Sequence, residues 1–415
     1  MLPECSKALT DLPPYLFVKL NSVKEEAVRR GLQLIDLGMG NPDQPTPAHV
    51  VEALCRSVRE DTSTHRYPQT KGLARLREAI AAWYHRRFQV TLDPGREVLP
   101  LLGSKEGLAH LFFTYLTPKD YALIPSPCYP VHYNATLLTG TKVHLMPLKE
   151  ESRFLPDLDA VPTAVARKAK VLLVNYPNNP TGAVVEDLAL FDRCAHFAKK
   201  NGCLVAHDNA YSELAFDGYR APSFLQLPQA RKYGVEFHSF SKTYSMAGWR
   251  IAFAVGNAEV LGNLYKFKSF LDYGIPGFIQ NAAVSALEGS QDYVSKITQT
   301  YRERRDVLVA SLREVGWTVP TPRATMYVWG HLPEPFRRGG SFRFAERLLL
   351  QEGVVVAPGI GFGPFGEGYV RFALVEDKSR IEEAVRRIGR FLRSARCERG
   401  RCGRRTGSSV LLVEH

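Results

Sequence analysis

The 415-residue sequence lacks any apolar run near the roughly 18 residues that cross a bilayer. Its start, MLPECSKALTDLPPYLF, has no basic stretch followed by an apolar core, so we expect no secretory signal. The 7 cysteines are scattered and form no CxxC pair, which argues against a disulfide scaffold or a zinc site. We therefore expect a cytoplasmic protein with no membrane partner.

The chain also lacks the patterns of several familiar sites. Its histidines, His207 and His238 among them, show no metal-ligand spacing, so we expect core or hydrogen-bonding roles for them and no metal. No GxSxG elbow of a serine hydrolase is present. The stretch GFGPFG (361–366) fits GxGxxG, but Pro364 interrupts it and a strand-like segment follows, whereas a dinucleotide site needs a helix there. We expect this loop instead to bring Arg371 to a site.

The net charge of +12 comes in part from the C-terminal end. The last stretch contains Arg393, Arg396, Arg399, Arg401, Arg404 and Arg405. Residues 396–415 are rich in glycine, serine and arginine and show neither helical nor strand periodicity, which predicts a disordered extension. A solvated tail explains this composition, so we expect no nucleic-acid partner.

The middle of the chain alternates short apolar strands with amphipathic helices. Strands are expected at VLLVNYP (171–177), CLVAHDNAY (203–211), VEFHSF (235–240) and IAFAV (251–255). One intervening segment, LALFDRCAHFAKKNG, is apolar at helical spacing and ends on Gly202, a residue typical of helix C-caps. Apolar strands separated by helices predict an α/β three-layer sandwich with a mostly parallel central sheet.

The pattern changes after about residue 290. A long charged helix, YVSKITQTYRERRDVLVASLREVG, precedes alternating strand-like and helical segments. We predict a smaller α+β domain that is built from both chain ends. The predicted boundaries are 1–46 for an N-terminal segment packing with the small domain, 47–290 for a large cofactor-binding domain, 291–395 for the small C-terminal domain, and 396–415 for the tail.

Polar clusters at 178–182, 208–211 and 239–242 follow three of the expected strands. Ligands of such sheets bind beyond the carboxyl ends of the strands, so these clusters should meet in one site. Lys242 lies among small hydroxyl residues in HSFSKTYSMAGWR. A lysine amine can condense with an aldehyde, and pyridoxal phosphate is the commonest aldehyde cofactor that proteins hold in this way.

Such a cofactor needs an anion beside its pyridine nitrogen, a donor to its phenolic oxygen and a cradle for its phosphate. Asp208 at about 4 Å, with an effective dielectric of about 20, would attract the pyridinium by roughly 4 kcal/mol. That attraction is roughly three pKa units before desolvation is subtracted. Tyr211 or Asn179 could donate to the phenolic oxygen. Candidates for the phosphate are Ser104 and Lys105 at a helix start, Ser239, Ser241 and Arg250.

The segments YPNNPTG, DNAY, SFSKTYSMAGWR and YVRFAL together resemble the signature of fold-type I, class I/II pyridoxal-phosphate aminotransferases. The resemblance covers about residues 10 to 395. Within the family, GSKEGLAHL, SKTYSMAGWRIAF and FLDYG resemble the branch of alanine-forming glutamate–pyruvate transaminases and LL-diaminopimelate aminotransferases. It implies transfer of an amino group between an L-amino acid and a 2-oxo acid (2-oxoglutarate or pyruvate), through a lysine Schiff base and a ping-pong mechanism.

The resemblance implies a role for each matching position. The catalytic residues would be Lys242, which binds the cofactor and then moves a proton, Asp208 at the pyridine nitrogen, and Tyr211. The cofactor would further contact Ser104, Lys105, Tyr129, Asn179, Ser239, Ser241 and Arg250, with the ring of Tyr129 stacked on it. Tyr67 would reach the phosphate of the neighbouring subunit, so the active form would be a homodimer with shared sites. The substrate would contact Arg371, Gly40, Asn179 and Tyr15.

Substrate identity and reaction type stay open at this point. In aspartate-preferring relatives an arginine of the partner clamps the distal carboxylate near the segment that reads FLDYGIPGFIQ here, and this segment contains no arginine. Alanine, glutamate, diaminopimelate or an unusual amino acid remain, and Tyr15 and Cys128 are candidates for the side-chain pocket. A C–S β-lyase or decarboxylase on the same scaffold is the alternative, and a non-enzymatic ligand-sensing regulator is a remote one.

Overall fold

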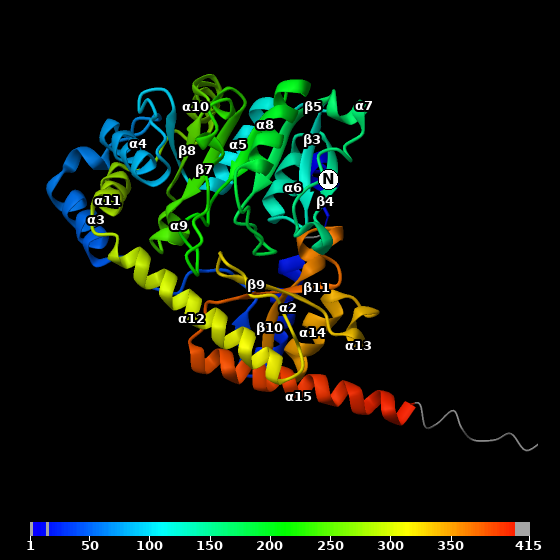
Figure 1. The fold of residues 1–415 in the computed structure, drawn as a ribbon. Coiled ribbons are helices and arrows are strands. Elements are labelled where there is room, and N and C mark those ends of the chain that lie inside the picture. The colour runs from blue at the N-terminus through cyan, green and yellow to red at the C-terminus, as the bar shows by residue number, and fades with distance from the viewer. Residues whose placement is uncertain (1–2, 14–15, 403–415) are drawn as a thin grey trace, which may run out of the picture.

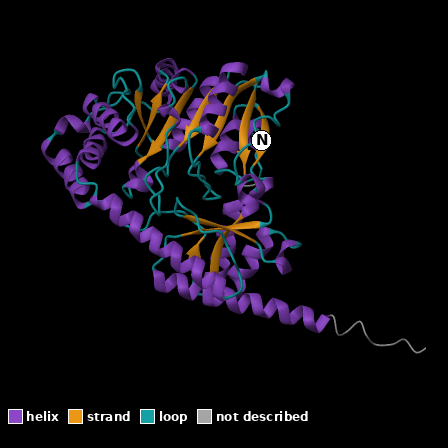
Figure 2. Cartoon of the chain, in the orientation of Figure 1, coloured by secondary structure: helices purple, strands orange, loops and turns teal. Residues whose placement is uncertain are grey.

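Two β-sheets, each with its own helices, make up the protein in the computed structural model, which describes residues 3–13 and 16–402. Figure 2 shows the strands as two separate groups, one in each half of the molecule. In Figure 1 the long helix α12 (Asp292–Glu314) runs from the larger half to the smaller one.

The larger sheet has seven strands in the order β2-β8-β7-β6-β5-β3-β4. They are β2 (Val98–Leu101), β3 (Tyr121–Ser126), β4 (Lys142–Pro147), β5 (Ala169–Asn175), β6 (Leu204–Asp208), β7 (Gly234–Ser239) and β8 (Ala252–Gly256). The five strands from β7 to β4 are parallel, whereas β8 is antiparallel to both of its neighbours. The predicted mostly parallel sheet is confirmed.

Helices cover both faces of this sheet because its strands are apolar on both sides. Val171 and Leu173 of β5 pack with helices α5, α6 and α10, while Leu172 and Val174 pack with α4, α8 and α11. The helices of the larger half are α3 (Ala48–Glu60), α4 (Ala74–Phe88), α5 (Ser104–Tyr115), α6 (Pro130–Leu138), α7 (Thr163–Ala166), α8 (Ala189–Asn201), α9 (Phe240–Thr243), α10 (Ala258–Leu271) and α11 (Gly277–Glu288). Helix α8 ends at the predicted C-cap, where Gly202 adopts a left-handed φ of 68°.

The smaller sheet has the order β1-β10-β11-β9 and draws on both chain ends. Its strands are β1 (Ile35–Leu37), β9 (Tyr327–His331), β10 (Val354–Pro358) and β11 (Tyr369–Ala373). Its helices, besides α12, are α2 (Leu16–Arg29), α13 (Glu334–Arg337), α14 (Ser341–Glu352) and α15 (Lys378–Cys402), and a short α1 (Lys7–Thr10) precedes them. Ile35–Leu37 pairs in parallel with 354–356 and α2 packs on α14, so these two elements belong to the small α+β unit. The preceding α1 instead contacts α6 of the larger half, so the predicted packing of the whole segment 1–46 with the small domain does not hold for α1.

The C-terminal end differs from the prediction of disorder beginning at residue 396. Helix α15 continues to Cys402, and Figure 1 shows its last turns extending away from the body of the molecule. The sequence from 391 to 402 contains arginine, alanine, leucine and glutamate, which favour helix, and only one glycine. The rest of the predicted tail, 403–415, lies outside the described residues. No helix within the described residues is both long enough and apolar enough to span a bilayer.

Candidate active site

The polar ends of the parallel strands converge on one cavity of about 240 Å³ between the two sheets. Of the residues proposed from the sequence, the cavity is lined by Gly40, Ser104, Lys105, Tyr129, Asn179, Asp208, Tyr211, Ser239, Ser241, Lys242, Arg250 and Arg371. A larger cavity of about 570 Å³, lined by Arg153, Val184 and Pro322 among others, contains none of them. The smaller cavity is therefore the candidate active site.

Lys242 belongs to the short helix α9, which begins directly after β7. The side chain of Ser239 accepts a hydrogen bond from the Ser241 amide at 3.1 Å and so caps this helix. The Lys242 Nζ donates to the carbonyl oxygen of Gly40 at 2.9 Å. Burial lowers the pKa of Lys242, an effect that Tyr327 opposes and Arg371 reinforces. A larger fraction of the Lys242 amine is therefore uncharged, as a nucleophile or base must be.

Asp208 is the last residue of β6 and is buried. Its Oδ2 accepts a hydrogen bond from His132 Nε2 at 2.9 Å, and its Oδ1 has no hydrogen-bond partner among the described residues. Its backbone oxygen accepts from Asn175 Nδ2 at 2.7 Å. One carboxylate oxygen is thus held in place while the other is free for a cationic donor in the cavity.

Backbone N–H groups and cations lie at one end of the cavity. Helix α5 begins at Ser104, directly after Gly103, and its first turn faces the cavity together with Lys105. Gly103 has a φ of 109°, and a Cβ at this position would collide with the guanidinium of Arg250. Arg250 Nη1 donates to the oxygen of Ala247 at 2.8 Å. A helix N-terminus with an adjoining guanidinium is suited to a phosphate.

Arg371 lines the cavity from β11 of the small sheet. It is 4% exposed. Its Nη1 donates to Asn179 Oδ1 at 2.7 Å and its Nη2 to the oxygen of Gly38 at 3.0 Å. The guanidinium carbon lies 4.0 Å from the ring centroid of Tyr327 and 4.6 Å from that of Phe362. The GFGPFG stretch forms two 3-10 turns before β11 rather than opening a helix, so it does lead the chain to Arg371.

Two tyrosines meet in the cavity, Tyr211 after β6 of the large sheet and Tyr327 at the start of β9 of the small sheet. The hydroxyls of Tyr211 and Tyr327 are 3.0 Å apart. Burial raises the pKa of Tyr211 well above its usual value, and Tyr327 adds to this effect. Burial opposes ionisation of Tyr327 as well, but Arg371 and Lys242 nearby lower its pKa below the usual value. The Tyr211 hydroxyl therefore keeps its proton and remains a hydrogen-bond donor.

Tyr67 does not line the cavity. It is 90% exposed and its ring centroid lies 5.6 Å from that of Tyr273. Tyr129 lines the cavity from the start of α6, with its ring edge-on to His132 at 5.6 Å between centroids. Tyr15, the last of the proposed site residues, lies outside the described residues. Cys128 is buried, which raises the pKa of its thiol to about 12.

Several lining residues were not proposed from the sequence, among them Met39, Asn175, Tyr327 and Phe362, and neither was His132 behind Asp208. Tyr129 is the residue before α6 and His132 lies in the first turn of this helix, so both are carried by the same helix start. Asn175 ends β5 as Asp208 ends β6. Ligands bind beyond the carboxyl ends of parallel strands, so this rule also indicates Asn175. Tyr327 and Phe362 belong to the small unit, and no local pattern connects them with the site.

Comparison with known proteins identifies the family. Residues 33–388 match the family described as aminotransferase class I and II. The chain belongs to this family. It is a pyridoxal-phosphate-dependent transaminase that moves an amino group between an amino acid and a 2-oxo acid.

This aminotransferase is similar along its length to curated and to solved relatives. An LL-diaminopimelate aminotransferase of Dehalococcoides mccartyi is 48% identical over 386 residues, which are 93% of this chain and 98% of that protein. One of Moorella thermoacetica is 46% identical over 387 residues, 93% and 98% of the two chains. The substrate-bound structure of BacF from Bacillus subtilis aligns with a TM-score of 0.90 at 38% identity, covering 94% of this chain and 98% of that one. A probable N-succinyldiaminopimelate aminotransferase of Thermus thermophilus gives 0.84 at 40% identity, covering 90% and 99%.

The cavity of the aminotransferase fits pyridoxal phosphate. The unpartnered Oδ1 of Asp208 suits a protonated ring nitrogen, because a buried carboxylate oxygen without a donor is costly. The glycine at 103 leaves room for Arg250 beside the start of α5, where a phosphate would be bound. Lys242 follows β7, which lies between β6 and β8 in the sheet, and it lines the same cavity.

Proposed function

We propose that this aminotransferase takes LL-diaminopimelate as its amino donor and 2-oxoglutarate or pyruvate as the acceptor. The main support is identity of 46–48% over 93% of the chain with proteins named LL-diaminopimelate aminotransferases. The segment 270–280 contains no arginine, which disfavours aspartate as the substrate. Arg371 within the cavity supplies the cation that any α-amino acid substrate requires.

The proposed roles follow from charge and position. Pyridoxal phosphate supplies an aldehyde that binds amines and a protonated ring that withdraws electrons from the substrate Cα. Lys242 would hold the cofactor in the resting enzyme and, once displaced, would take the proton from the substrate Cα and deliver it to C4′, the cofactor carbon that keeps the amino group. The lowered pKa of Lys242 favours the uncharged amine, which is the form that can accept a proton. Asp208 holds the ring nitrogen protonated, and His132 keeps the carboxylate in place.

The remaining contacts orient the cofactor and the substrate. Ser104, Lys105, Ser239, Ser241 and Arg250 bind the phosphate, and Tyr129 stacks on the ring. Tyr211 and Asn179 donate to the phenolic oxygen. Arg371 binds the substrate α-carboxylate, with Gly40 beside it. Holding the reacting groups in one geometry converts an encounter in solution into a step within a complex.

Arg371→Lys should lower kcat/KM by about a hundredfold, mostly through a higher KM, because an ammonium cannot make the two parallel bonds of a guanidinium. Initial rates over a range of amino-donor concentrations measure this effect. Arg323→Lys is the matched control, since Arg323 is half-exposed and pairs with Glu186 away from the cavity. An unchanged KM in the Arg371 variant would show that the carboxylate is bound elsewhere.

We also propose that the enzyme is a homodimer with shared sites. Tyr67 and Phe270 are 90% and 81% exposed, and Leu271 and Tyr273 next to Phe270 in the chain are also exposed. Large apolar side chains gathered on a surface are typical of a subunit interface. In this arrangement Tyr67 donates to the phosphate in the partner's site, which gives an exposed tyrosine a function.

A mixing experiment tests the shared site. Tyr67→Ala and Lys242→Ala are each expected to be weakly active or inactive alone. After dissociation and random reassociation, half of the dimers pair one variant with the other, and one of the two sites in each hybrid is intact. Roughly a quarter of wild-type activity should therefore return. If a preparation shown to contain the hybrid recovers no activity, Tyr67 does not contribute to the site across the interface.

The proposed substrate is tested by a screen of donors and acceptors, monitored by the visible absorbance of the bound cofactor. LL-diaminopimelate should convert the cofactor to its aminated form, and 2-oxoglutarate or pyruvate should restore it. Product analysis separates the alternatives that share this scaffold. A keto acid formed in step with the aminated cofactor supports transamination, whereas pyruvate with ammonia indicates a β-lyase and carbon dioxide a decarboxylase.

We place the enzyme in the cytoplasm. Among the described residues, the cysteines Cys5, Cys55, Cys128, Cys194 and Cys203 are all unpaired. Free thiols persist in a reducing compartment, which supports this location. The substrates proposed above are small metabolites, which the cytoplasm supplies.

A further inference from the structure

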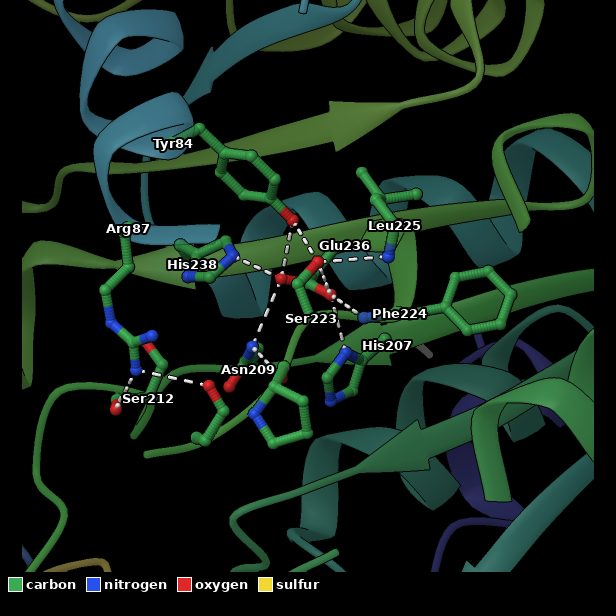
Figure 3. Close-up of polar contacts among 12 residues, drawn as sticks. Tyr84, Arg87, His207, Asn209, Ser212, Ser223, Phe224, Leu225, Glu236 and His238 are labelled. Atoms are coloured by element: carbon green, nitrogen blue, oxygen red, sulfur yellow. Dashed lines mark hydrogen bonds and ion pairs between the residues drawn. The ribbon is translucent and has the colours of Figure 1, made fainter. Parts of the chain in front are cut away.

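A second polar cluster lies in the apolar core on the α4 and α8 face of the large sheet (Figure 3). At its centre is Glu236 of β7, whose side chain is fully buried. Six donor groups lie within hydrogen-bond distance of its carboxylate, and two of them, the hydroxyls of Tyr84 and Ser223, also contact each other at 2.5 Å. The six are Tyr84 Oη at 2.8 Å, His238 Nε2 at 2.6 Å, Asn209 Nδ2 at 3.1 Å, His207 Nδ1 at 2.8 Å, Ser223 Oγ at 3.0 Å and the Phe224 amide at 2.9 Å.

The charge of this cluster follows from its hydrogen bonds. Burial alone would raise the pKa of Glu236, but His207 and His238 hold it well below its usual value, so the carboxylate is ionised. His207 faces this carboxylate with Nδ1 and the carbonyl oxygen of Tyr176 with Nε2, at 3.0 Å. The carbonyl oxygen can only accept, so Nε2 carries a hydrogen, while Nδ1 is held against the Glu236 carboxylate. Both ring nitrogens of His207 are therefore engaged, one on Glu236 and one on the segment of Tyr176.

The donors come from segments that continue into the active site. His207 precedes Asp208 on β6 and Asn209 follows it, so their side chains contact Glu236 while Asp208 points to the opposite face and the cavity. His238 is the residue before Ser239, the cap of the helix that carries Lys242. Tyr176, whose carbonyl oxygen binds His207, begins the segment that ends at Asn179 on Arg371.

Stability of the fold does not account for this arrangement. The cluster is surrounded by apolar side chains such as Phe88, Phe191, Phe224 and Phe253, and apolar residues of similar volume would fill the same space. A buried carboxylate with its polar partners gives little or no net stability over such a filling, because the cost of removing these groups from water offsets their attraction. The carboxylate instead fixes geometry. Hydrogen bonds are directional, so the groups around Glu236 hold their segments in set positions relative to one another.

We propose that Glu236 is a positioning residue for transamination, which fixes Asp208, Lys242 and Asn179 relative to one another from the far side of the sheet. The inference rests on the roles proposed above for these three residues. Glu236 itself touches neither substrate nor cofactor. It acts through His207, Asn209 and His238, and its loss lets three strand ends shift independently beneath the cofactor.

Glu236→Gln tests this role with minimal change of shape. The glutamine side chain replaces one carboxylate oxygen, which accepts three hydrogen bonds, with an NH₂ group that cannot accept any. The network must therefore rearrange. We expect kcat to fall by about ten- to a hundredfold, with KM within about threefold of wild type, because misplacement of catalytic groups by about 1 Å has effects of this size. The affinity of the apoenzyme for pyridoxal phosphate, measured by quenching of intrinsic fluorescence, should fall by about tenfold.

The matched control is Glu288→Gln, which makes the same chemical change in a half-exposed carboxylate that pairs with Arg75. Circular dichroism and thermal unfolding of each variant show whether it is folded at the assay temperature. A folded Glu236→Gln protein with wild-type kcat and cofactor affinity would overturn the proposal. If that variant does not fold, Tyr84→Phe removes one donor and keeps the carboxylate, and it should lower kcat by about two- to fivefold with an unchanged KM. No change in kcat for Tyr84→Phe would then overturn it.

A direct measurement needs neither variant nor substrate. The apoenzyme labelled with ¹⁵N at histidine should show, by nuclear magnetic resonance, ring N–H signals that exchange slowly with water, and His207→Gln should remove one of them. A His207 ring whose N–H exchanges rapidly would contradict the buried contacts with Glu236 and Tyr176. Kinetic tests use L-alanine and L-glutamate beside LL-diaminopimelate. Failure of the proposed substrate would appear in the wild type, whereas failure of the positioning role would appear as wild-type kinetics in the variants.

Discussion

Lys242→Ala should lower the rate of amino transfer by at least about 10⁴-fold, while the protein still binds pyridoxal phosphate non-covalently. Proton transfer by a positioned side chain contributes about 10² to 10⁴ on its own, and the variant also loses the covalent attachment that orients the cofactor. The contacts of Ser239, Arg250 and the start of α5 remain in place, so the phosphate is still bound. Single-turnover absorbance changes with LL-diaminopimelate measure the rate.

The control for this prediction is Lys199→Ala, which removes an exposed lysine from the last turn of α8. It should keep wild-type rates and the wild-type absorbance of the bound cofactor. Cofactor content after gel filtration separates loss of binding from loss of chemistry. Normal turnover by Lys242→Ala would mean that another amine does this work.

Asp208→Asn should lower kcat by about a thousandfold. An ionised carboxylate about 4 Å from the pyridine nitrogen attracts its proton by roughly 4 kcal/mol at an effective dielectric of about 20. The amide loses most of that attraction, and a neutral ring withdraws electrons from the substrate Cα poorly. The loss corresponds to roughly three pKa units of the ring nitrogen, or roughly a thousandfold in its protonated fraction.

The same variant keeps the size of the side chain, so packing against His132 changes little. Asp192→Asn, on the surface of α8, is the matched control. A chemical test separates charge from shape. A cofactor analogue with an N-methylated ring carries a permanent positive charge and should restore part of the activity of Asp208→Asn. An active Asp208→Asn enzyme with the natural cofactor would show that ring protonation does not depend on this residue.

Much of the fold could be predicted from the sequence because its periodicity is local. Apolar runs such as VLLVN, ending in polar residues, predicted parallel strands, and the C-cap glycine at 202 predicted the end of α8. The helical continuation of α15 to Cys402 was missed, since arginine-rich segments occur both in disordered tails and on exposed helices. Only the amount of apolar surface nearby separates these two cases, and the sequence of the tail does not contain that information.

The cavity could be assembled from the sequence where its residues follow strands. Asp208, Lys242 and Asn179 meet because the carboxyl ends of parallel strands share one edge of the sheet. Tyr327 and Phe362 could not be found in this way, because their positions depend on how the small sheet packs against the large one. The pairing of the Tyr211 and Tyr327 hydroxyls, for example, joins residues 116 positions apart.

The buried cluster around Glu236 and His207 shows the same limit. The sequence predicted core or hydrogen-bonding roles for His207 and His238, which is confirmed, but no local pattern in the strand GVEFHS indicates a role for Glu236. Its six donors come from β6, β7, α4 and the segments around 209 and 223. Only the three-dimensional packing reveals that they converge on one carboxylate.

The most direct test of the account is reduction of the resting enzyme with borohydride, followed by digestion and mass spectrometry. Reduction makes the bond between an amine and the cofactor permanent, so the modified peptide identifies the residue that carries it. We predict one phosphopyridoxyl group, on the peptide that contains Lys242. A modified peptide containing a different lysine, or no modified peptide from enzyme that shows bound cofactor, would contradict the account.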